Sequence, residues 1–127
     1  MGYLLDTHAL LWYFEDSPRL SRRIMRILQD DASIKMVSST SLWEIAIKAN
    51  LGKLTLHFSF EQLLNDLKNS DITILQIQDE YMRELFSLPY IHRDPFDRLL
   101  ISTAIAEELT VITADENIHK YDVDWIW

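Results

Sequence analysis

The chain has 127 residues, of which 48% are hydrophobic, and only two glycines and three prolines. This suits one domain spanning residues 1–127, which would bury roughly two-thirds of the surface that its unfolded form exposes. The absence of cysteine excludes disulfides, thiolate metal sites and a cysteine nucleophile. A net charge of −8 argues against a basic nucleic-acid-binding face. It favours carboxylates gathered around a cation, or a basic protein partner.

The N-terminal segment carries no targeting signal that we recognise. Residues Met1–Asp6 lack the basic lead and the long apolar body of a signal peptide. No apolar run in the sequence is long enough to span a membrane. We therefore expect a cytoplasmic protein that makes no membrane contact.

The first half of the chain predicts strands interspersed with helices. The expected elements are a strand at Tyr3–Leu5, a helix at His8–Phe14, a helix with Leu20, Ile24, Ile27 and Leu28 inward, a strand at Ile34–Val37, a helix from Thr40 or Ser41 to Asn50, and a helix opened by Ser59. The expected core face of the helix ending at Asn50 is Leu42, Ile45, Ala46 and Ala49. Gly52 suits the left-handed cap after it.

The second half continues the alternation. Its expected elements are a strand at Ile72–Ile77, helices at Asp79–Leu88 and Pro95–Leu109, a strand at Thr110–Thr113, a short helix near Asn117 and an edge strand at Val123–Ile126. Apolar strands that alternate with helices are typical of a parallel sheet covered on both faces. The sequence therefore predicts a three-layer α/β/α fold with a central, mainly parallel sheet of four or five strands.

The stretch from Asp94 to Asp97 places two carboxylates where a loop becomes a helix. Pro95 suits the first helical position, because its missing N–H has no intrahelical partner there. Asp94 then suits the N-cap, and Asp97 falls in the first turn, where the helix dipole favours its charge. A capped helix start therefore explains both residues without any chemistry.

Three further acids fall where the predicted fold brings them to the same edge. Asp6 ends the first strand, Glu44 lies in the helix after the second strand, and Asp115 follows the fourth strand. In such sheets, ligands bind at the carboxyl ends of the strands, where the strand order reverses. Four separate segments would thus deliver carboxylates to one edge of one sheet.

Each of these acids also has a structural explanation. Asp6 and Asp115 suit the caps of the helices that follow them. Glu44 suits an exposed ion pair with Lys48, four residues on, worth only a few tenths of a kcal/mol. These explanations do not account for the shared edge.

Carboxylates brought together need compensation. Two of them about 5 Å apart repel by roughly 3 kcal/mol at an effective dielectric constant of about 20. The cluster must therefore hold protons or bind a cation. Oxygen ligands without Cys or a paired His favour Mg²⁺ or Mn²⁺ over Zn²⁺. Such an ion suits phosphodiester hydrolysis, because it activates water and neutralises charge that builds on the phosphate.

These segments, in this order, resemble the PIN-domain ribonucleases, and among them the VapC toxins of type II toxin–antitoxin pairs. The matching segments are Leu4-Leu5-Asp6-Thr7-His8, Ser41-Leu42-Trp43-Glu44-Ile45, Asp94-Pro95-Phe96-Asp97-Arg98-Leu99-Leu100 and Ile112-Thr113-Ala114-Asp115. The resemblance covers nearly the whole chain. It implies an α/β/α fold and a Mg²⁺- or Mn²⁺-dependent endoribonuclease that cleaves single-stranded or loop RNA. It also implies a homodimer and a cognate antitoxin that occludes the active site.

By position, the resemblance implies which residues hold the metal and act in catalysis. They are Asp6, Glu44, Asp97 and Asp115. Asp94 is implied as a cap or a supporting residue. Thr7 and Thr113 lie beside two of the acids and are candidates to hold them or a metal-bound water, with an ordinary turn role as the alternative.

His92 and Arg98 are candidate contacts to phosphate or to an antitoxin. Arg98 points about 100° away from Asp97 on a helix, so it is not expected to share the metal. A surface ion pair is its structural alternative. His8 heads an apolar helix and is interpreted as a packed residue. The four tryptophans, Trp12, Trp43, Trp125 and Trp127, are interpreted as core or protein-interface residues rather than as platforms for RNA bases.

Two alternatives to a ribonuclease toxin stay open at this point. One is a PIN-like binding module without catalytic activity, although four acids argue against lost activity. The other is a Mg²⁺-binding phosphoacceptor domain of the receiver type, which would need a lysine on a late strand. Residues 123–127 offer no such lysine.

Overall fold

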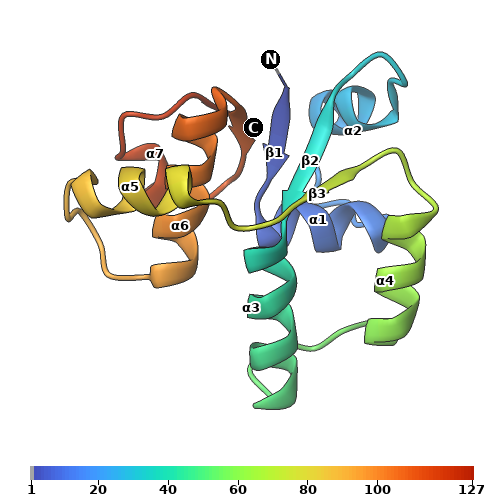
Figure 1. The fold of residues 1–127 in the computed structure, drawn as a ribbon. Helices are drawn as coiled ribbons and strands as arrows, with labels where there is room; N and C mark the ends of the chain where they lie inside the picture. The colour runs from blue at the N-terminus through green and yellow to red at the C-terminus, as the bar shows by residue number, and fades with distance from the viewer. Residues whose placement is uncertain (1) are drawn as a thin grey trace.

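The computed structural model describes residues 2–127 (Figure 1). One sheet of five parallel strands has the order β3-β2-β1-β4-β5. The strands are β1 (Tyr3–Leu5), β2 (Lys35–Ser38), β3 (Thr73–Leu75), β4 (Thr110–Ile112) and β5 (Trp125–Ile126). The predicted α/β fold with a parallel central sheet is confirmed.

Every predicted helix is present within the described residues. They are α1 (Thr7–Phe14), α2 (Arg22–Gln29), α3 (Ser39–Asn50), α4 (Phe60–Lys68), α5 (Asp79–Ser87), α6 (Pro95–Glu107) and α7 (Glu116–His119). The expected caps Ser59 and Asp94 accept hydrogen bonds from backbone N–H groups in the first turns of α4 and α6. Ser38, rather than Thr40 or Ser41, caps α3. None of these helices, in residues 2–127, is long and apolar enough to cross a membrane.

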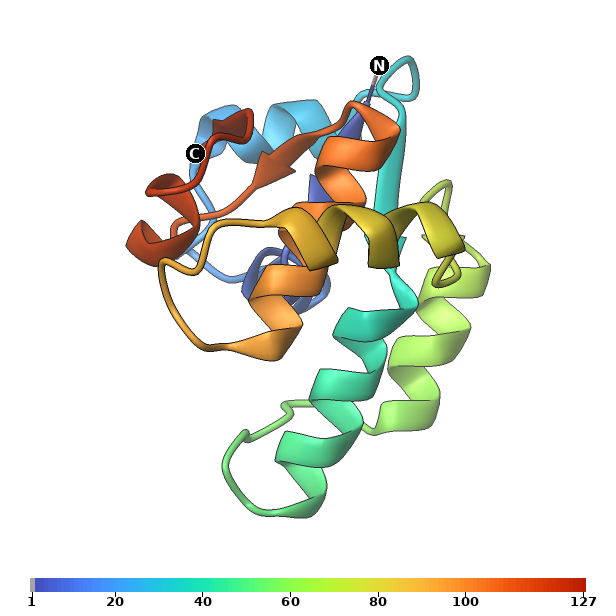
Figure 2. The ribbon, with the colours of Figure 1, turned by 60° about the vertical axis from the view of Figure 1, so that its left-hand side comes forward.

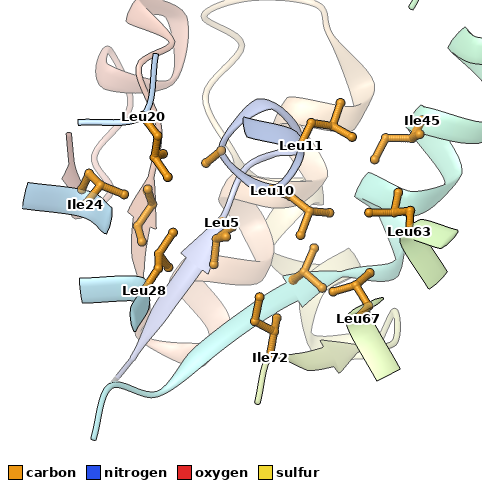
Figure 3. Packing of buried hydrophobic residues seen from close by; sticks show 13 residues of the cluster. Leu5, Leu10, Leu11, Leu20, Ile24, Leu28, Ile45, Leu63, Leu67 and Ile72 are labelled. Carbon is orange, nitrogen blue, oxygen red and sulfur yellow. The ribbon is translucent and has the colours of Figure 1, made fainter. Parts of the chain in front are cut away.

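Neighbouring residues on each central strand face opposite layers. Leu5 packs with α1, α2 and α4 in a cluster that Figure 3 shows, together with Leu10, Ile24 and Leu63. Leu4 packs on the other face, against Ile101 and other residues of α6. This alternation, a consequence of the two-residue repeat of a strand, gives the three layers seen in Figures 1 and 2.

Two details of burial differ from the prediction. Ile34 is 52% exposed and lies before β2, whereas Lys35 is fully buried within the strand. The Lys35 ammonium donates to the carbonyls of Leu28 and Asp30 and pairs with Asp71. In α3, Ala46 is exposed, and the buried face carries Ser41 and Glu44 beside Ile45.

The strand order reverses at β1, between β2 on one side and β4 on the other. In the sheet register, Leu5 pairs with Val37 of β2 and with Ile112 of β4. The residues that come directly after these three, Asp6, Ser38 and Thr113, therefore leave the sheet at the same level. The backbone N–H of Asp6 donates to the Ile112 carbonyl, 3.1 Å away, which fixes Asp6 beside the end of β4.

Candidate metal and active site

Asp6 lies at the reversal point of the sheet, and its side chain is 7% exposed. Its Oδ1 accepts a 2.8 Å hydrogen bond from the backbone N–H of Ala9, so it caps α1. Burial raises the pKa of Asp6, and the nearby Asp115 charge adds to this, while Thr113, Ala9 and His8 act to lower it. A carboxyl held in this way gains from any cation that reaches it.

Asp97 is the second carboxyl with a strongly shifted pKa. Its side chain is 18% exposed, and Oδ2 lies 3.0 Å from Nε2 of His92. Burial raises the pKa of Asp97 to about 7, and the charges of Asp94, Asp115 and Glu44 add to the rise against the opposing His92 bond. The nearby acids that raise this pKa come from α3, from the α6 cap and from the end of β4.

Glu44 is buried near the middle of α3, so the expectation that its ion pair with Lys48 is exposed is wrong. Its Oε1 accepts a 2.6 Å hydrogen bond from Thr7 Oγ1, and its Oε2 pairs with Lys48. Burial acts to lower the pKa of Lys48, but Glu44, Asp94 and Asp97 outweigh it and raise this pKa. Lys48 thus belongs to the acid cluster. Among the described residues it is the only lysine or arginine that forms an ion pair with one of these acids.

Asp115 caps α7 by accepting a hydrogen bond from Asn117 N through Oδ1. The Thr113 hydroxyl oxygen accepts a 3.0 Å hydrogen bond from the backbone N–H of Asp115. Thr113 also hydrogen-bonds to Asp6 and lowers the pKa of that carboxyl. Asp94 caps α6 by accepting from the N–H groups of Phe96 and Asp97. Asp6, Asp94 and Asp115 therefore perform the capping tasks that their positions suggested.

The acids are the right type of ligand for a divalent cation, but their side chains lie too far apart in this structure to hold one together. No three His, Asp or Glu side chains among residues 2–127 lie close enough together to hold an ion. Asp97 and Asp115 each bond to the protein through one carboxylate oxygen, which leaves the other to act as a ligand. The raised pKa values of Asp6 and Asp97 reflect negative charge that burial leaves undercompensated. All-oxygen ligands of this kind suit Mg²⁺ or Mn²⁺.

A family model described as the PIN domain matches residues 3–124 of this chain. The chain belongs to the PIN domain family. PIN domains are generally nucleases, and the family generally uses divalent metal ions. The match decides against the receiver-type phosphoacceptor. A comparison with curated proteins found no match.

Solved structures share the fold of this PIN domain over nearly its whole length. The VapBC2 complex of Rickettsia felis, bound to a DNA fragment from its promoter, has a TM-score of 0.74 and 19% identity over 99% of this chain and 98% of that one. FitAcB of Neisseria gonorrhoeae has a TM-score of 0.67 and 19% identity, with 98% and 96% covered. DNA-bound VapBC of Salmonella typhimurium has a TM-score of 0.69 and 14% identity, with 99% and 97% covered. At these identities the likeness establishes the fold.

The structure shows the surroundings of three neighbours of the acids in this PIN domain. His8 is exposed, so its interpretation as a packed residue is wrong. Arg98 makes no ion pair within the described residues; its guanidinium donates to the carbonyls of Pro89 and Leu88 and to the Tyr121 hydroxyl. It therefore holds the loop before α6, and its contact with a phosphate or an antitoxin stays a prediction. Trp43 lies outside the core and is 56% exposed. Its ring contacts Phe96 in a T-shaped arrangement.

Two further residues lie beside the acids and were not singled out as candidate site residues from the sequence. The Tyr121 hydroxyl lies 2.8 Å from Nδ1 of His92, so it orients the imidazole that contacts Asp97. Lys48, read only as half of a surface pair, lines a pocket of about 550 Å³ with His92, Arg93 and Phe96. The four-residue spacing of Glu44 and Lys48 was the available signal for Lys48. No local pattern marks Tyr121.

Proposed function

We propose that this chain is a metal-dependent endoribonuclease that cleaves phosphodiester bonds of single-stranded or loop RNA. The observation that carries the proposal is the position of Asp6, Glu44, Asp97 and Asp115. They come from four segments, at the carboxyl edge of the sheet beside its reversal point. Membership of a family whose domains are generally nucleases supports it. An enzyme with this substrate would work in the cytoplasm.

We assign these four carboxylates as the ligands of Mg²⁺ or Mn²⁺. When bound, such an ion supplies water activation and charge neutralisation at the phosphate. Thr7 and Lys48 hold Glu44 toward the edge, and Thr113 supports Asp6 and Asp115. His92 orients Asp97, and Asp94 acts as a cap that sets the direction of α6. The chain needs no nucleophilic side chain for this chemistry, because water is the attacking group.

The chain has a net charge of −8, which repels the RNA backbone. Basic side chains near the acids would provide a local attraction for its phosphates. Lys48, Arg93 and Asp94 line the pocket of about 550 Å³. A phosphate on either side of the scissile bond would contact the two basic side chains there. A bound divalent ion would add further positive charge at the acids. The local potential, rather than the net charge, therefore governs substrate binding.

We further propose that the chain acts as the toxin of a toxin–antitoxin pair, as a homodimer that a cognate antitoxin inhibits. The similar structures include two VapBC assemblies and a toxin–antitoxin complex from Klebsiella pneumoniae. Apolar side chains on α5 and in the following loop are exposed and available to a partner: Met82, Phe86, Tyr90 and Ile91. Phe86 is 94% exposed, which is unusual for a phenylalanine of a monomer.

The test is RNA cleavage by the purified chain, free of antitoxin, with Mg²⁺ or Mn²⁺. Asp6→Asn and Asp97→Asn are measured beside the unmodified chain. Asn still caps α1 at residue 6, so the first variant removes a charge while it keeps the helix start. We expect cleavage by the unmodified chain and a loss of at least about a hundredfold in each variant.

The outcomes separate the assignments. Absence of cleavage with both metals contradicts the proposed nuclease activity and favours the alternative of a binding module without catalytic activity. Equal cleavage by the variants contradicts the assigned site. Light scattering tests the homodimer: a monomer in solution, unchanged in mass on adding the antitoxin encoded beside it, contradicts both partners.

A further inference from the structure

A small pocket lies on the α1 side of the acids. It measures about 300 Å³ and is lined by Asp6, His8, Trp12, Arg19, Ala114 and Asp115. This volume is at the lower end of the range for small-molecule sites. Asp6 and Asp115 belong to the acid cluster already described. Trp12 and Arg19 have no task in that cluster, so the aromatic and basic side of the pocket needs its own explanation.

Local geometry builds this side of the pocket from α1 and the loop that follows. His8 and Trp12 are one helical turn apart, and their ring centroids are 5.6 Å apart. After α1, Asp16 adopts a left-handed conformation with φ of 52°, and Ser17 Oγ accepts a hydrogen bond from Arg19 N. The chain thereby turns back and brings the Arg19 guanidinium to 5.8 Å from the Trp12 ring centroid.

The indole of Trp12 is supported from the protein side. Trp127 contacts it in an edge-on arrangement with centroids 5.7 Å apart, and both residues pack against the main core. Trp12 is therefore a fixed ring that is partly accessible. His8 and Arg19 are exposed, and within residues 2–127 neither takes part in an ion pair.

A fixed aromatic ring beside an unpaired guanidinium has the two features that recognise a nucleotide. Bases stack on aromatic side chains, and arginine binds phosphate through its planar set of donors. The two carboxylates on the opposite wall bring the acid cluster into the same pocket.

We propose that this pocket is a nucleotide subsite, in which one base of a single-stranded RNA packs against Trp12 and Arg19 binds a phosphate of the same strand. The inference rests on the proposed function, because Asp6 and Asp115 would then face the neighbouring phosphodiester. The subsite gives the enzyme a requirement for an unpaired nucleotide next to the bond that it cuts, since a base inside a duplex cannot stack on a protein ring.

Binding is tested with a fluorescein-labelled, single-stranded RNA hexamer of mixed sequence, by anisotropy with Mg²⁺. All proteins carry Asp97→Asn so that the RNA stays intact. We compare Trp12→Leu and Arg19→Gln with matched controls, Trp125→Leu and Arg23→Gln, which remove the same groups at exposed positions outside the pocket. We expect about tenfold weaker binding for each pocket variant, partial rescue by Trp12→Phe, and changes within about twofold for the controls.

Thermal unfolding identifies any variant that fails to fold, and Arg19→Gln, at an exposed loop position, keeps the test valid if Trp12→Leu unfolds. Unchanged affinity in folded Arg19→Gln and Trp12→Leu, or absence of RNA binding by the parent, overturns the subsite. Cleavage by the chain with native Asp97 is measured in parallel. Cleavage with an unchanged KM in Arg19→Gln overturns the subsite and leaves the proposed function standing. Loss of binding in Arg19→Gln without cleavage by any protein supports the subsite and overturns the proposed function.

Discussion

Thr7 Oγ1 donates a 2.6 Å hydrogen bond to Glu44 Oε1, across 37 positions of sequence. Both side chains are buried. The bond joins the first residue of α1 to α3, so it fixes the direction of Glu44 relative to Asp6, which directly precedes Thr7. A threonine that resembles an ordinary helix-start residue is therefore a positioning residue for an acid on another helix.

Replacing Thr7 by valine should slow RNA cleavage by about tenfold, because Glu44 loses the hydroxyl that orients it. The free energy of unfolding should fall by about 1–2 kcal/mol, the usual cost of leaving a buried polar group without its partner. Initial cleavage rates and urea unfolding measure the two effects.

Thr40→Val is the matched control. Thr40 is also buried in this region, but its hydroxyl is a buried oxygen with no hydrogen-bond partner in the described residues. Its replacement should leave cleavage unchanged and should not lower stability. Equal cleavage rates in the two variants would argue against a positioning role for Thr7.

The pKa of Asp97 predicts how stability depends on pH without metal. The pKa is about 7 in the folded protein, against an ordinary value of 3.8. Between these values the folded protein holds a proton that the unfolded chain releases. This contribution to stability is fully present below about pH 4 and is lost as pH rises through about 7. The free energy of unfolding should therefore be lower at pH 8 than at pH 4 by up to about 4 kcal/mol on account of Asp97.

Urea unfolding in EDTA at several pH values checks this dependence. Asp97→Asn has no titrating carboxyl at this position, so its free energy of unfolding should decline less between pH 4 and pH 8. Mn²⁺ at pH 8 should stabilise the unmodified chain more than the variant, because it binds the ionised carboxyl. Parallel pH curves for the two proteins would refute the assignment.

The buried Lys35 predicts a stability effect far from the acids. Its ammonium holds the carbonyls of Leu28 and Asp30 at the end of α2 and pairs with Asp71 before β3. Lys35→Met fills the same space but leaves two carbonyls without a donor, so we expect a loss of about 2 kcal/mol. Lys53→Met, at an exposed lysine, should change stability by less than about 0.5 kcal/mol. Chemical denaturation that gives equal midpoints for both variants would contradict this role.

Local signals in the sequence were sufficient for the elements and for the position of the acids. Pro95 and Asp94 define the start of α6, and Asp6 and Asp115 follow strands that the register places side by side. Burial of Lys35 was not predictable, since it depends on carbonyls at the end of another element and on a distant carboxylate.

The same limit applies to Arg98 and Glu44. The Arg98 side chain bonds to Pro89 and to Tyr121, 23 positions later, and no periodicity indicates that arrangement. Glu44 and Lys48 have the spacing of a surface pair. The packing of α3 against its neighbouring helices buries Glu44, where Thr7 of α1 contacts it, and leaves Lys48 partly exposed. Pattern thus predicted the elements that carry the acids, while the partners of these side chains depend on tertiary contacts.

The central claim is that Asp6, Glu44, Asp97 and Asp115 form one site for a divalent cation. Its most direct test is calorimetric titration with Mn²⁺ of the unmodified chain, Asp97→Asn and Asp94→Asn. The two variants make the same change in charge three residues apart, and Asn at residue 94 retains the helix cap. We predict that Asp97→Asn weakens Mn²⁺ binding by at least about tenfold and Asp94→Asn by no more than about threefold. Equal affinities in all three proteins, or no saturable binding to the unmodified chain, would contradict the claim.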